Sequence, residues 1–351
     1  MTPARLLGLG RAFAPHSITQ AEALDWARLR FADRFAGFER MTPVFANAGI
    51  RTRQLAMPVE WYLAPQDWAT RTAAYRRVAR DLFIAAARDA LNDAGLEPGD
   101  IDAVVTVSST GIATPSLEAL AHAEMGFRAD VMRVPVFGLG CAGGIAGMAL
   151  AARLAAAQPG TRVLMVTVEL CSLSFRDDQP NKSNVVATAL FGDGAAAAIL
   201  CSEGTGEVAV TAAAEHLWPE TLDVMGWDVA PHGFGVIFAQ SIPALVTRHL
   251  ADAFAGLLRR MGTCAEAIAR PVCHPGGAKV IAAIEQSLSL DQGSLDAERE
   301  VLADHGNMSA PTVIHVLHRL ISTGRIARDA SSAMLALGPG FTLGGLLLSP
   351  V

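Results

Sequence analysis

Charged residues, aromatic residues and cysteines are all scarce in this 351-residue chain, and each scarcity excludes a class of protein. Only 18% of the residues are charged, the formal net charge is −6, and no run is dense in lysine or arginine. The chain therefore lacks the electrostatic footprint of a nucleic-acid-binding protein. Charges interrupt every apolar stretch well before it could span a bilayer, and Arg5 and Arg11 break up the apolar N-terminal segment. We expect neither a signal peptide nor membrane insertion.

The five cysteines, at positions 141, 171, 201, 264 and 273, are odd in number and lack the paired spacing of metal ligands. This pattern suits reduced thiols, so we expect a cytoplasmic protein without a disulfide framework. His315 and His318 lie three positions apart on an expected helix, but no third ligand accompanies them. The sequence therefore predicts no metal site.

Hydrophobic residues make up 51% of the chain, which is enough to bury a large core in two domains or one duplicated unit. The segment Ser17-Ile-Thr-Gln20 resembles a capping box that opens a helix. The pattern predicts helices over 17–35, 73–94, 244–260, 278–287, 295–304 and 307–322, and strands over 103–108, 131–137, 162–169, 195–200, 207–213, 269–273, 333–337 and 342–348. This alternation indicates a layered α/β fold, with halves of comparable organisation over 1–201 and 202–351.

Cys141 lies where an apolar, strand-like run meets a turn of small residues and then an alanine-rich helix. Unpaired backbone NH groups and the helix dipole stabilise a thiolate at such a position. The glycines at 138, 140, 143 and 144 let a bulky thioester approach the backbone. A buried cysteine packed as a small hydrophobe is the alternative, but the glycines and the helix start favour a nucleophile.

His274 and Asn307 complete a possible catalytic set. His274 ends an expected strand immediately before Pro-Gly-Gly, and Asn307 stands at an expected helix start. Each alone could be structural, as a satisfied polar core group or a helix cap. With Cys141 they provide a soft nucleophile, a proton partner and an amide donor, a set that a protease could also use. Both side chains can donate to one carbonyl oxygen, which is what decarboxylation of a malonyl thioester requires.

Six motifs in this order resemble the type III polyketide synthases of the chalcone synthase superfamily, from end to end of the chain. They are Gly140-Cys-Ala-Gly-Gly144, Val168-Glu-Leu-Cys-Ser-Leu-Ser-Phe-Arg176, Ala189-Leu-Phe-Gly-Asp-Gly-Ala195, His274-Pro-Gly-Gly277, Gly306-Asn-Met-Ser309 and Gly338-Pro-Gly-Phe-Thr342. The resemblance implies a thiolase-like layered αβαβα fold of two pseudo-duplicated halves. It also implies that Cys141 accepts the acyl group and that His274 and Asn307 form the decarboxylation and oxyanion pair.

The resemblance assigns further residues to substrate binding. Phe191 matches a gatekeeping phenylalanine, and the second gatekeeper falls at Val236, which would widen the cavity. The other expected cavity residues are Ser109, Thr114, Cys171, Ser174, Gly338 and Pro339. Coenzyme A phosphates need a cationic mouth, for which we expect Arg51, Arg53 and Lys279 with Gly276 and Gly277. Glu169 and Asp193 are expected to be structural carboxylates.

The resulting hypothesis is iterative decarboxylative condensation of an acyl-CoA starter with malonyl-CoA, without a carrier protein or a cofactor, followed by cyclisation to a pyrone, resorcinol or phloroglucinol-type product. The resemblance implies a homodimer in which the Thr114-Pro115 loop reaches toward the partner's cavity. Two alternatives stay open: a ketoacyl synthase of the type that starts fatty-acid synthesis, which would condense once, and a non-catalytic thiolase-fold partner protein. The widened cavity favours a medium or long fatty acyl starter, but the starter, the number of extensions and the mode of cyclisation are not determined by the sequence.

Overall fold

Nine strands form one mixed sheet through the molecule. The computed structural model describes residues 2–176, 178, 180–230 and 233–351. Across the sheet the order is β11 (Ile268–Cys273), β12 (Ser331–Gly338), β13 (Thr342–Pro350), β8 (Val208–Leu217), β1 (Ala4–Phe13), β7 (Asp193–Cys201), β6 (Val163–Leu170), β4 (Ala103–Val107) and β5 (Met132–Val136). β1 pairs with β7 along most of its length but meets β8 only at Ala4 and Arg5, so the sheet has two halves joined at one corner.

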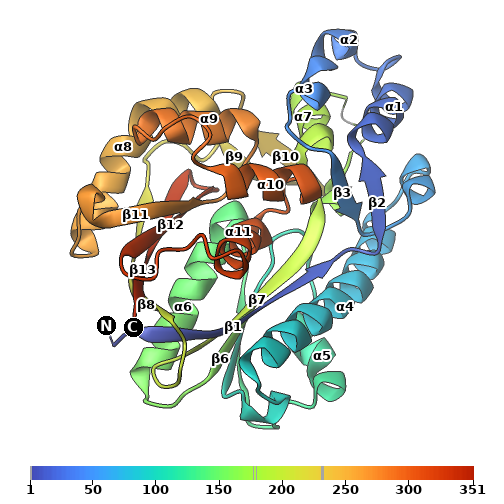
Figure 1. Cartoon of the computed structure of the whole chain (residues 1–351). Coiled ribbons are helices and arrows are strands. Elements are labelled where there is room, and N and C mark those ends of the chain that lie inside the picture. The colour runs from blue at the N-terminus through green and yellow to red at the C-terminus, as the bar shows by residue number, and fades with distance from the viewer. Residues whose placement is uncertain (1, 177, 179, 231–232) are drawn as a thin grey trace.

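Two helices, α6 (Gly143–Ala157) and α11 (Ala310–Ser322), lie between the two halves of the sheet (Figure 1). α6 packs against β4 and β6 of one half and against β12 and β13 of the other. Outside the sheet, α4 (Trp68–Ala94) and α5 (Leu117–Met125) cover one half, while α8 (Ile242–Arg260) covers the other with α9 (Ala278–Ser287) packed on it. This arrangement confirms the five-layer αβαβα fold that the sequence predicts.

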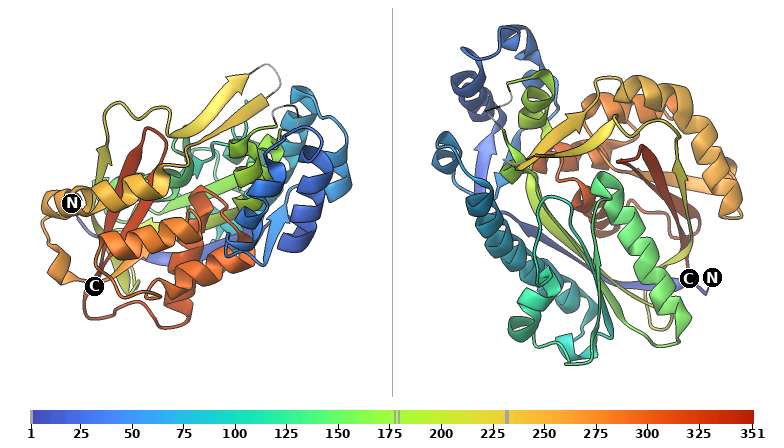
Figure 2. Two further views of the ribbon diagram at one scale, coloured as in Figure 1. Left: turned by 90° about the horizontal axis from the view of Figure 1, so that it is seen from above. Right: turned by 180° about the vertical axis from the view of Figure 1, so that it is seen from behind.

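The remaining elements are short and most of them gather at one end of the molecule (Figure 2). They are the pair β2 (His16–Thr19) and β3 (Thr52–Leu55), the hairpin β9 (Met225–Ala230) and β10 (Gly233–Phe238), the helices α1 (Gln20–Phe31), α2 (Phe38–Met41), α3 (Pro43–Ala46), α7 (Lys182–Leu190) and α10 (Asp296–His305), and the 3-10 turns η1 (Val59–Leu63), η2 (Pro98–Asp100), η3 (Gly140–Ala142), η4 (Cys171–Ser174) and η5 (Ala265–Ala267). Several of these elements surround the functional site described below.

Two expectations at the N-terminus are wrong. Ser17 is not the cap of α1, because it pairs with Gln54 in the β2–β3 ladder. The capping box is instead made by Thr19 and Glu22, and α1 begins at Gln20 and ends at Phe31. Strand β1 is absent from the expected elements, since its glycines weaken the strand pattern. Packing needs them, because a Cβ on Gly10 would lie 2.2 Å from the Ala86 carbonyl oxygen of α4.

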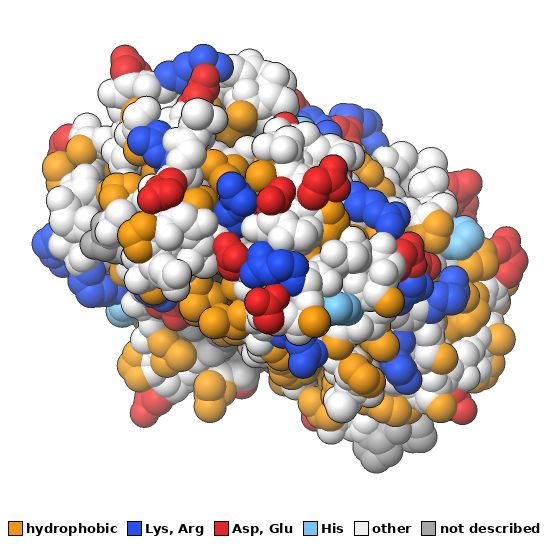
Figure 3. Space-filling view, turned by 90° about the horizontal axis from the view of Figure 1, so that it is seen from below, with side chains coloured by type: hydrophobic (Ala, Val, Ile, Leu, Met, Phe, Trp, Pro, Cys, Tyr) orange, Lys and Arg blue, Asp and Glu red, His pale blue; other side chains and the backbone are white. Residues whose placement is uncertain are grey.

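The expectation that charges interrupt every apolar stretch well before membrane-spanning length is wrong for Gly140–Ala157, which is long and apolar enough to cross a membrane by length and composition. It is the central helix α6, flanked by sheet on both sides, so its apolarity is that of a core helix. On the face seen in Figure 3, basic and acidic side chains lie interspersed, a pattern typical of a solvated surface. The cytoplasmic location and the division into 1–201 and 202–351 stay predictions.

Candidate active site

Cys141 lies in the turn η3 immediately before the central helix α6, and its side chain is buried. The Ser109 hydroxyl accepts hydrogen bonds from the NH groups of Gly138 and Gly140, both at 3.2 Å, and so holds the turn in place. The end of β12 presses against the turn, because a Cβ on Gly338 would lie 2.6 Å from the Cβ of Ala142. The turn is thus held between Ser109 and Gly338, two residues that the sequence analysis assigns to the cavity.

Asn307 reaches the same turn from a different part of the chain. Its NH donates to the Leu190 carbonyl at 2.9 Å, and its carbonyl accepts from the Gly192 NH at 3.0 Å, so the segment lies beside Phe191. Its Oδ1 accepts from the Ser309 NH at 2.8 Å. Helix α11 therefore begins at Ala310 and not at Asn307 as the sequence predicts, and Ser309 is its cap residue.

The side chains of Ser309 and Asn307 lie beside the Cys141 thiol and act to lower its pKa, while the Asn307 amide nitrogen donates to the Gly276 carbonyl at 3.2 Å. Burial raises the pKa of Cys141 to about 11, and the polar side chains of Ser309 and Asn307 act in the opposite direction because they favour the thiolate. The structure thus brings the predicted nucleophile and the predicted amide donor into contact.

His274 follows the last residue of β11, where its NH donates to the Leu335 carbonyl of β12 at 2.8 Å. The side chain is buried, and within the described part of the chain neither ring nitrogen has a hydrogen-bond partner. Burial lowers the pKa of His274 to about 3, so the resting imidazole is neutral and has one NH to offer. Buried polar atoms are normally paired, so both ring nitrogens of His274 are available to a substrate.

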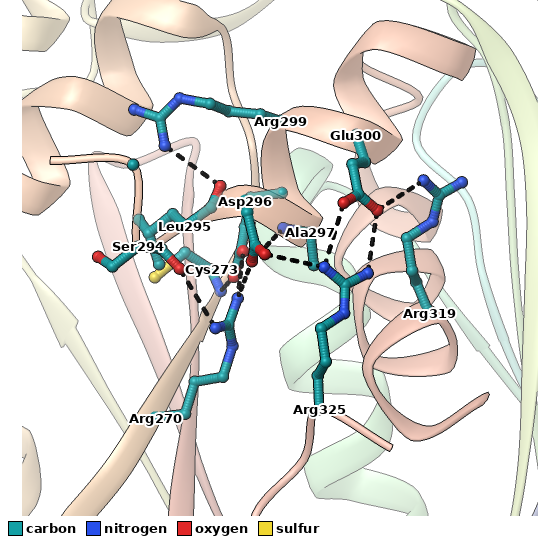
Figure 4. A network of polar contacts seen from close by, with 12 residues as sticks. Arg270, Cys273, Ser294, Leu295, Asp296, Ala297, Arg299, Glu300, Arg319 and Arg325 are labelled. Atoms are coloured by element: carbon teal, nitrogen blue, oxygen red, sulfur yellow. Dashed lines mark hydrogen bonds and ion pairs between the residues drawn. The ribbon is translucent and has the colours of Figure 1, made fainter. Parts of the chain in front are cut away.

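A network of ion pairs joins β11, the strand that precedes His274, to α10, the helix that precedes Asn307 (Figure 4). The buried Glu298 carboxylate accepts from the Cys273 NH at 3.0 Å and from Arg270 at 3.1 Å, which fixes the end of β11. Further along α10, Glu300 binds Arg325 and Arg319, and Arg319 also binds Asp304 at 2.9 Å. Helix α10, which precedes Asn307, is therefore tied to β11, which ends immediately before His274.

A cavity opens around Cys141, here called the reaction cavity. Of the residues assigned to substrate binding from the sequence, Ser109, Cys171, Phe191, Val236 and Pro339 line it. Ser174 lines a neighbouring cavity. Thr114 is exposed and lies outside the lining of the reaction cavity in its own chain, and its approach to a partner stays a prediction.

Several residues that line the reaction cavity are not predicted by the sequence analysis. Trp227 and Phe238 come from the β9–β10 hairpin, and Ser309 comes from the cap of α11. The Phe238 ring packs edge-on against Phe191, with centroids 5.9 Å apart, so Phe191 does have an aromatic partner although Val236 is aliphatic. Ser309 was detectable, since it follows Asn307 by two residues in a quoted motif, whereas nothing in the local pattern places Trp227.

Glu169 and Asp193 are buried beside the cavity and serve the architecture. Glu169 accepts from the Ser109 NH at 3.0 Å and from the Thr110 hydroxyl at 2.7 Å, and burial raises its pKa to about 8. Asp193 accepts from the Ala56 and Ser172 NH groups, and burial raises its pKa to about 6. These contacts fit the structural role that the sequence predicts for both.

A surface cleft lies next to the reaction cavity, and Phe238 lines both. Lys279, Gly276 and Gly277, all assigned to coenzyme A, line the cleft, and so does Arg40, which the sequence analysis does not single out. The N-terminus of α9 lies in this wall, where backbone NH groups favour phosphate. Arg51 is exposed outside the lining and pairs with Asp304.

Arg53 does not have the place expected of a phosphate ligand. It is only 3% exposed, and its guanidinium donates to the Gln20 side chain at 2.7 Å and to the carbonyls of Thr188 and Ala189. These bonds tie β3 to the end of α7. The geometry therefore favours a structural role for this arginine.

Replacing Arg53 with methionine should lower the free energy of unfolding by about 3 kcal/mol, because buried carbonyls lose a charged donor. Denaturant unfolding measures this change. Arg51→Ala, at an exposed site, is the matched control and should change stability by no more than about 0.5 kcal/mol. An unchanged stability of Arg53→Met with weaker binding of coenzyme A would restore the phosphate role.

Comparison with known proteins decides the family. Residues 1–204 match the N-terminal domain and residues 209–351 the C-terminal domain of chalcone and stilbene synthases. The chain belongs to this family. It is 38% identical to a 1,3,6,8-tetrahydroxynaphthalene synthase of Streptomyces peucetius subsp. caesius over 96% of this chain and 90% of that protein. It is 35% identical to a putative chalcone synthase of Bacillus subtilis over 98% of both chains.

The solved structures agree with this family. The crystal structure of the Streptomyces coelicolor 1,3,6,8-tetrahydroxynaphthalene synthase, a bacterial type III polyketide synthase, superposes with a TM-score of 0.93 at 31% identity and covers 99% of both chains. The present chain is therefore a type III polyketide synthase, an acyltransferase that uses coenzyme A thioesters. The predicted family and enzyme class are confirmed.

Proposed function

We propose that this type III polyketide synthase loads an acyl group from an acyl-CoA onto Cys141 and extends it repeatedly with malonyl-CoA. The observation that supports this most is the position of the Cys141 thiol in the wall of the reaction cavity, with the Asn307 side chain acting on it. In the loading step the Cys141 sulfur attacks the acyl carbonyl carbon and the bond to the coenzyme A sulfur breaks. His274 carries the thiol proton to the departing sulfur.

Extension then uses His274 and Asn307 as a pair of donors. Malonyl-CoA loses carbon dioxide, and the electron pair of the broken carbon–carbon bond becomes an enolate whose oxygen accepts from the imidazole NH and the Asn307 amide. The enolate carbon attacks the thioester carbonyl on Cys141, a carbon–carbon bond forms, and the sulfur leaves as thiolate. Because burial lowers the pKa of His274, its imidazole is neutral, and it donates a hydrogen bond to the enolate oxygen without carrying a positive charge. This chemistry needs no cofactor beyond the thioesters themselves.

Several rounds of extension followed by cyclisation would give a pyrone, a resorcinol or a phloroglucinol-type product. Similarity to proteins named for a tetrahydroxynaphthalene product supports repeated extension over a single condensation. Mass analysis of products from the purified enzyme with acyl-CoA starters and malonyl-CoA tests the proposal. We expect products that carry two or more added two-carbon units. A product with one added unit only would favour the single-condensation alternative.

The cleft is the proposed site for the coenzyme A phosphates. Lys279→Ala should raise KM for the acyl-CoA about three- to fivefold with little change in kcat, because an exposed charge contributes uniform binding. Initial-rate kinetics measure this split. Arg259→Ala removes an exposed charge outside the cleft lining and is the control. Equal effects of both variants would contradict a specific phosphate contact.

We also propose that two copies of the chain associate through the β5 edge. Ile112, Met132 and Phe137 are 50%, 54% and 56% exposed along this edge and the neighbouring loop, which is more apolar surface than an isolated edge normally shows. The Thr114 loop lies in the same region. Light scattering after size-exclusion chromatography should give the mass of two chains, and a single-chain mass would contradict this assembly.

A further inference from the structure

The imidazole of His274 has no polar anchor among the residues that the structure describes, since neither ring nitrogen has a hydrogen-bond partner there. The side chain of Asn307, by contrast, is held at both ends of its amide. Its Oδ1 accepts from the Ser309 NH at 2.8 Å, and its Nδ2 donates to the Gly276 carbonyl at 3.2 Å. The position of the His274 ring therefore depends on the backbone that carries it.

That backbone is the end of an edge strand. β11 lies at one edge of the nine-stranded sheet, with β12 as its parallel neighbour. The His274 NH points to β12, where it donates to the Leu335 carbonyl at 2.8 Å. NH groups alternate in direction along a strand, so the NH of the preceding residue, Cys273, points away from the sheet. Without a partner for this NH, the strand end would be held on one side only.

Glu298 of α10 supplies that partner. Its side chain is buried, and its Oε1 accepts from the Cys273 NH at 3.0 Å. Its Oε2 accepts from Arg270, which belongs to the same strand, at 3.1 Å. The carboxylate thus binds β11 at two points three positions apart and holds the strand end from the side opposite β12.

The helix that carries this carboxylate is itself fixed by ion pairs (Figure 4). In its first turn, Asp296 binds Arg270 at 3.1 Å and Arg325 at 2.9 Å. One turn further, Glu300 binds Arg325 at 2.9 Å. Because Asp296 and Glu300 flank position 298 in α10, their ion pairs limit the movement of the Glu298 carboxylate.

Burial of the Glu298 carboxylate costs free energy, because it removes the water that stabilises the charge. Burial raises the pKa of this carboxyl, while the Cys273 NH and Arg270 act in the opposite direction because they favour the ionised form. A buried ion pair can often be replaced by apolar residues of similar volume without loss of stability, so its contribution is better sought in the geometry that it fixes. Here that geometry is the end of β11, immediately before His274.

We propose that Glu298 is a positioning residue for His274, and that its carboxylate holds the end of β11 where the imidazole NH meets the enolate oxygen of malonyl-CoA. This inference rests on the proposed function, in which His274 donates to that oxygen. Glu298 lines neither the reaction cavity nor the cleft, so it acts through the strand and not on the substrate. A shift of about 1 Å at a catalytic group can lower a rate by up to about 100-fold. Loss of the carboxylate should therefore lower kcat and leave KM unchanged.

Two substitutions test the hydrogen bond from Cys273 to Glu298. Glu298→Met keeps a similar volume but removes both hydrogen bonds, so kcat for malonyl-CoA decarboxylation should fall about tenfold, with KM within about twofold of the wild type. Glu298→Gln keeps an oxygen for the Cys273 NH and should recover most of that loss. Release of labelled carbon dioxide measures both rates. Equal kcat for Glu298→Met and the wild type would overturn the proposal.

Glu285 of α9 is the matched control, because it is a second buried carboxylate bound to an arginine. It accepts from the NH groups of Gly293 and Leu295 and from Arg299 at 2.6 Å, so its partners lie in the segment 293–299 and not in β11. Glu285→Met should lower stability in denaturant unfolding about as much as Glu298→Met, while kcat stays within about twofold of the wild type. A tenfold loss of kcat in Glu285→Met would mean that the loss follows from lowered stability and would contradict a positioning role.

A second background separates this inference from the proposed function. In His274→Ala the imidazole is absent, so adding Glu298→Met should lower the remaining decarboxylation rate by no more than about twofold. A further tenfold loss in that background would show that Glu298 acts by another route and would overturn the inference. Full decarboxylation by His274→Ala alone would instead refute the role of His274 in the proposed function.

Arg270→Gln gives a milder test that does not depend on the folding of Glu298→Met. The Arg270 side chain is 19% exposed, and its loss frees one oxygen of the Glu298 carboxylate. We expect kcat to fall about threefold in the wild-type background and to stay unchanged in His274→Ala. The same fall in both backgrounds would overturn the inference.

Discussion

Cys141→Ala should form no polyketide from any acyl-CoA and malonyl-CoA, with a loss of about 10³-fold or more in kcat. The Cys141 sulfur lies in the wall of the reaction cavity beside Ser309 and Asn307, and alanine leaves no atom to accept the acyl group. Intact mass spectrometry should show an acyl adduct on the wild-type protein and none on the variant. Product mass analysis measures the loss of turnover.

The other cavity thiol is the matched control for this substitution. Cys171 is buried in the same cavity, and burial raises its pKa well above the usual value. Cys171→Ala should therefore keep the acyl adduct. An acyl adduct that survives in Cys141→Ala and disappears in Cys171→Ala would show that Cys171 is the nucleophile and would contradict the role proposed for Cys141.

Asn307→Ala should lower the rate of malonyl-CoA decarboxylation by about 10²- to 10³-fold, because one of two donors to the enolate oxygen is lost. Loading of the starter on Cys141 should fall much less, since that step depends on the sulfur and on His274. Release of labelled carbon dioxide measures the first step, and intact mass spectrometry measures the second.

Asn307→His is the conservative partner of this variant, because it restores an NH donor at the same position. It should recover part of the decarboxylation rate that alanine loses. The Asn307 side chain also accepts from the Ser309 NH, so a purely structural role would reduce loading and decarboxylation together. That parallel loss, without recovery in Asn307→His, would contradict the role of enolate donor.

Most of the regular structure could be predicted because it follows from local signals. Helix α9 is found over the predicted range, at Ala278–Ser287, and α4 ends at Gly95 in the left-handed conformation that a glycine cap provides. Local sequence patterns fail to predict an element where packing against a distant part of the chain determines the residue type. Gly8 and Gly10 of β1 are required by contact with α4, and their presence hides the strand from its own pattern.

The proposed catalytic set could be named from the sequence, but the contacts that surround it could not. Cys141, His274 and Asn307 each stand at the end of a strand or before a helix, where small flanking residues signal an approach to substrate. The burial of Arg53 depends on carbonyls that lie 135 and 136 positions away in the chain. No local pattern carries such a contact, and the same is true of Trp227, whose place depends on the hairpin folding over Ser109.

The convergence of three side chains on one substrate is tested most directly by a crystal structure of the enzyme acylated at Cys141. We expect the thioester carbonyl oxygen within about 2.7–3.1 Å of both a ring nitrogen of His274 and the amide nitrogen of Asn307. An acyl-enzyme in which the imidazole faces away from that oxygen, or in which the acyl group sits on another residue, would contradict the proposed mechanism.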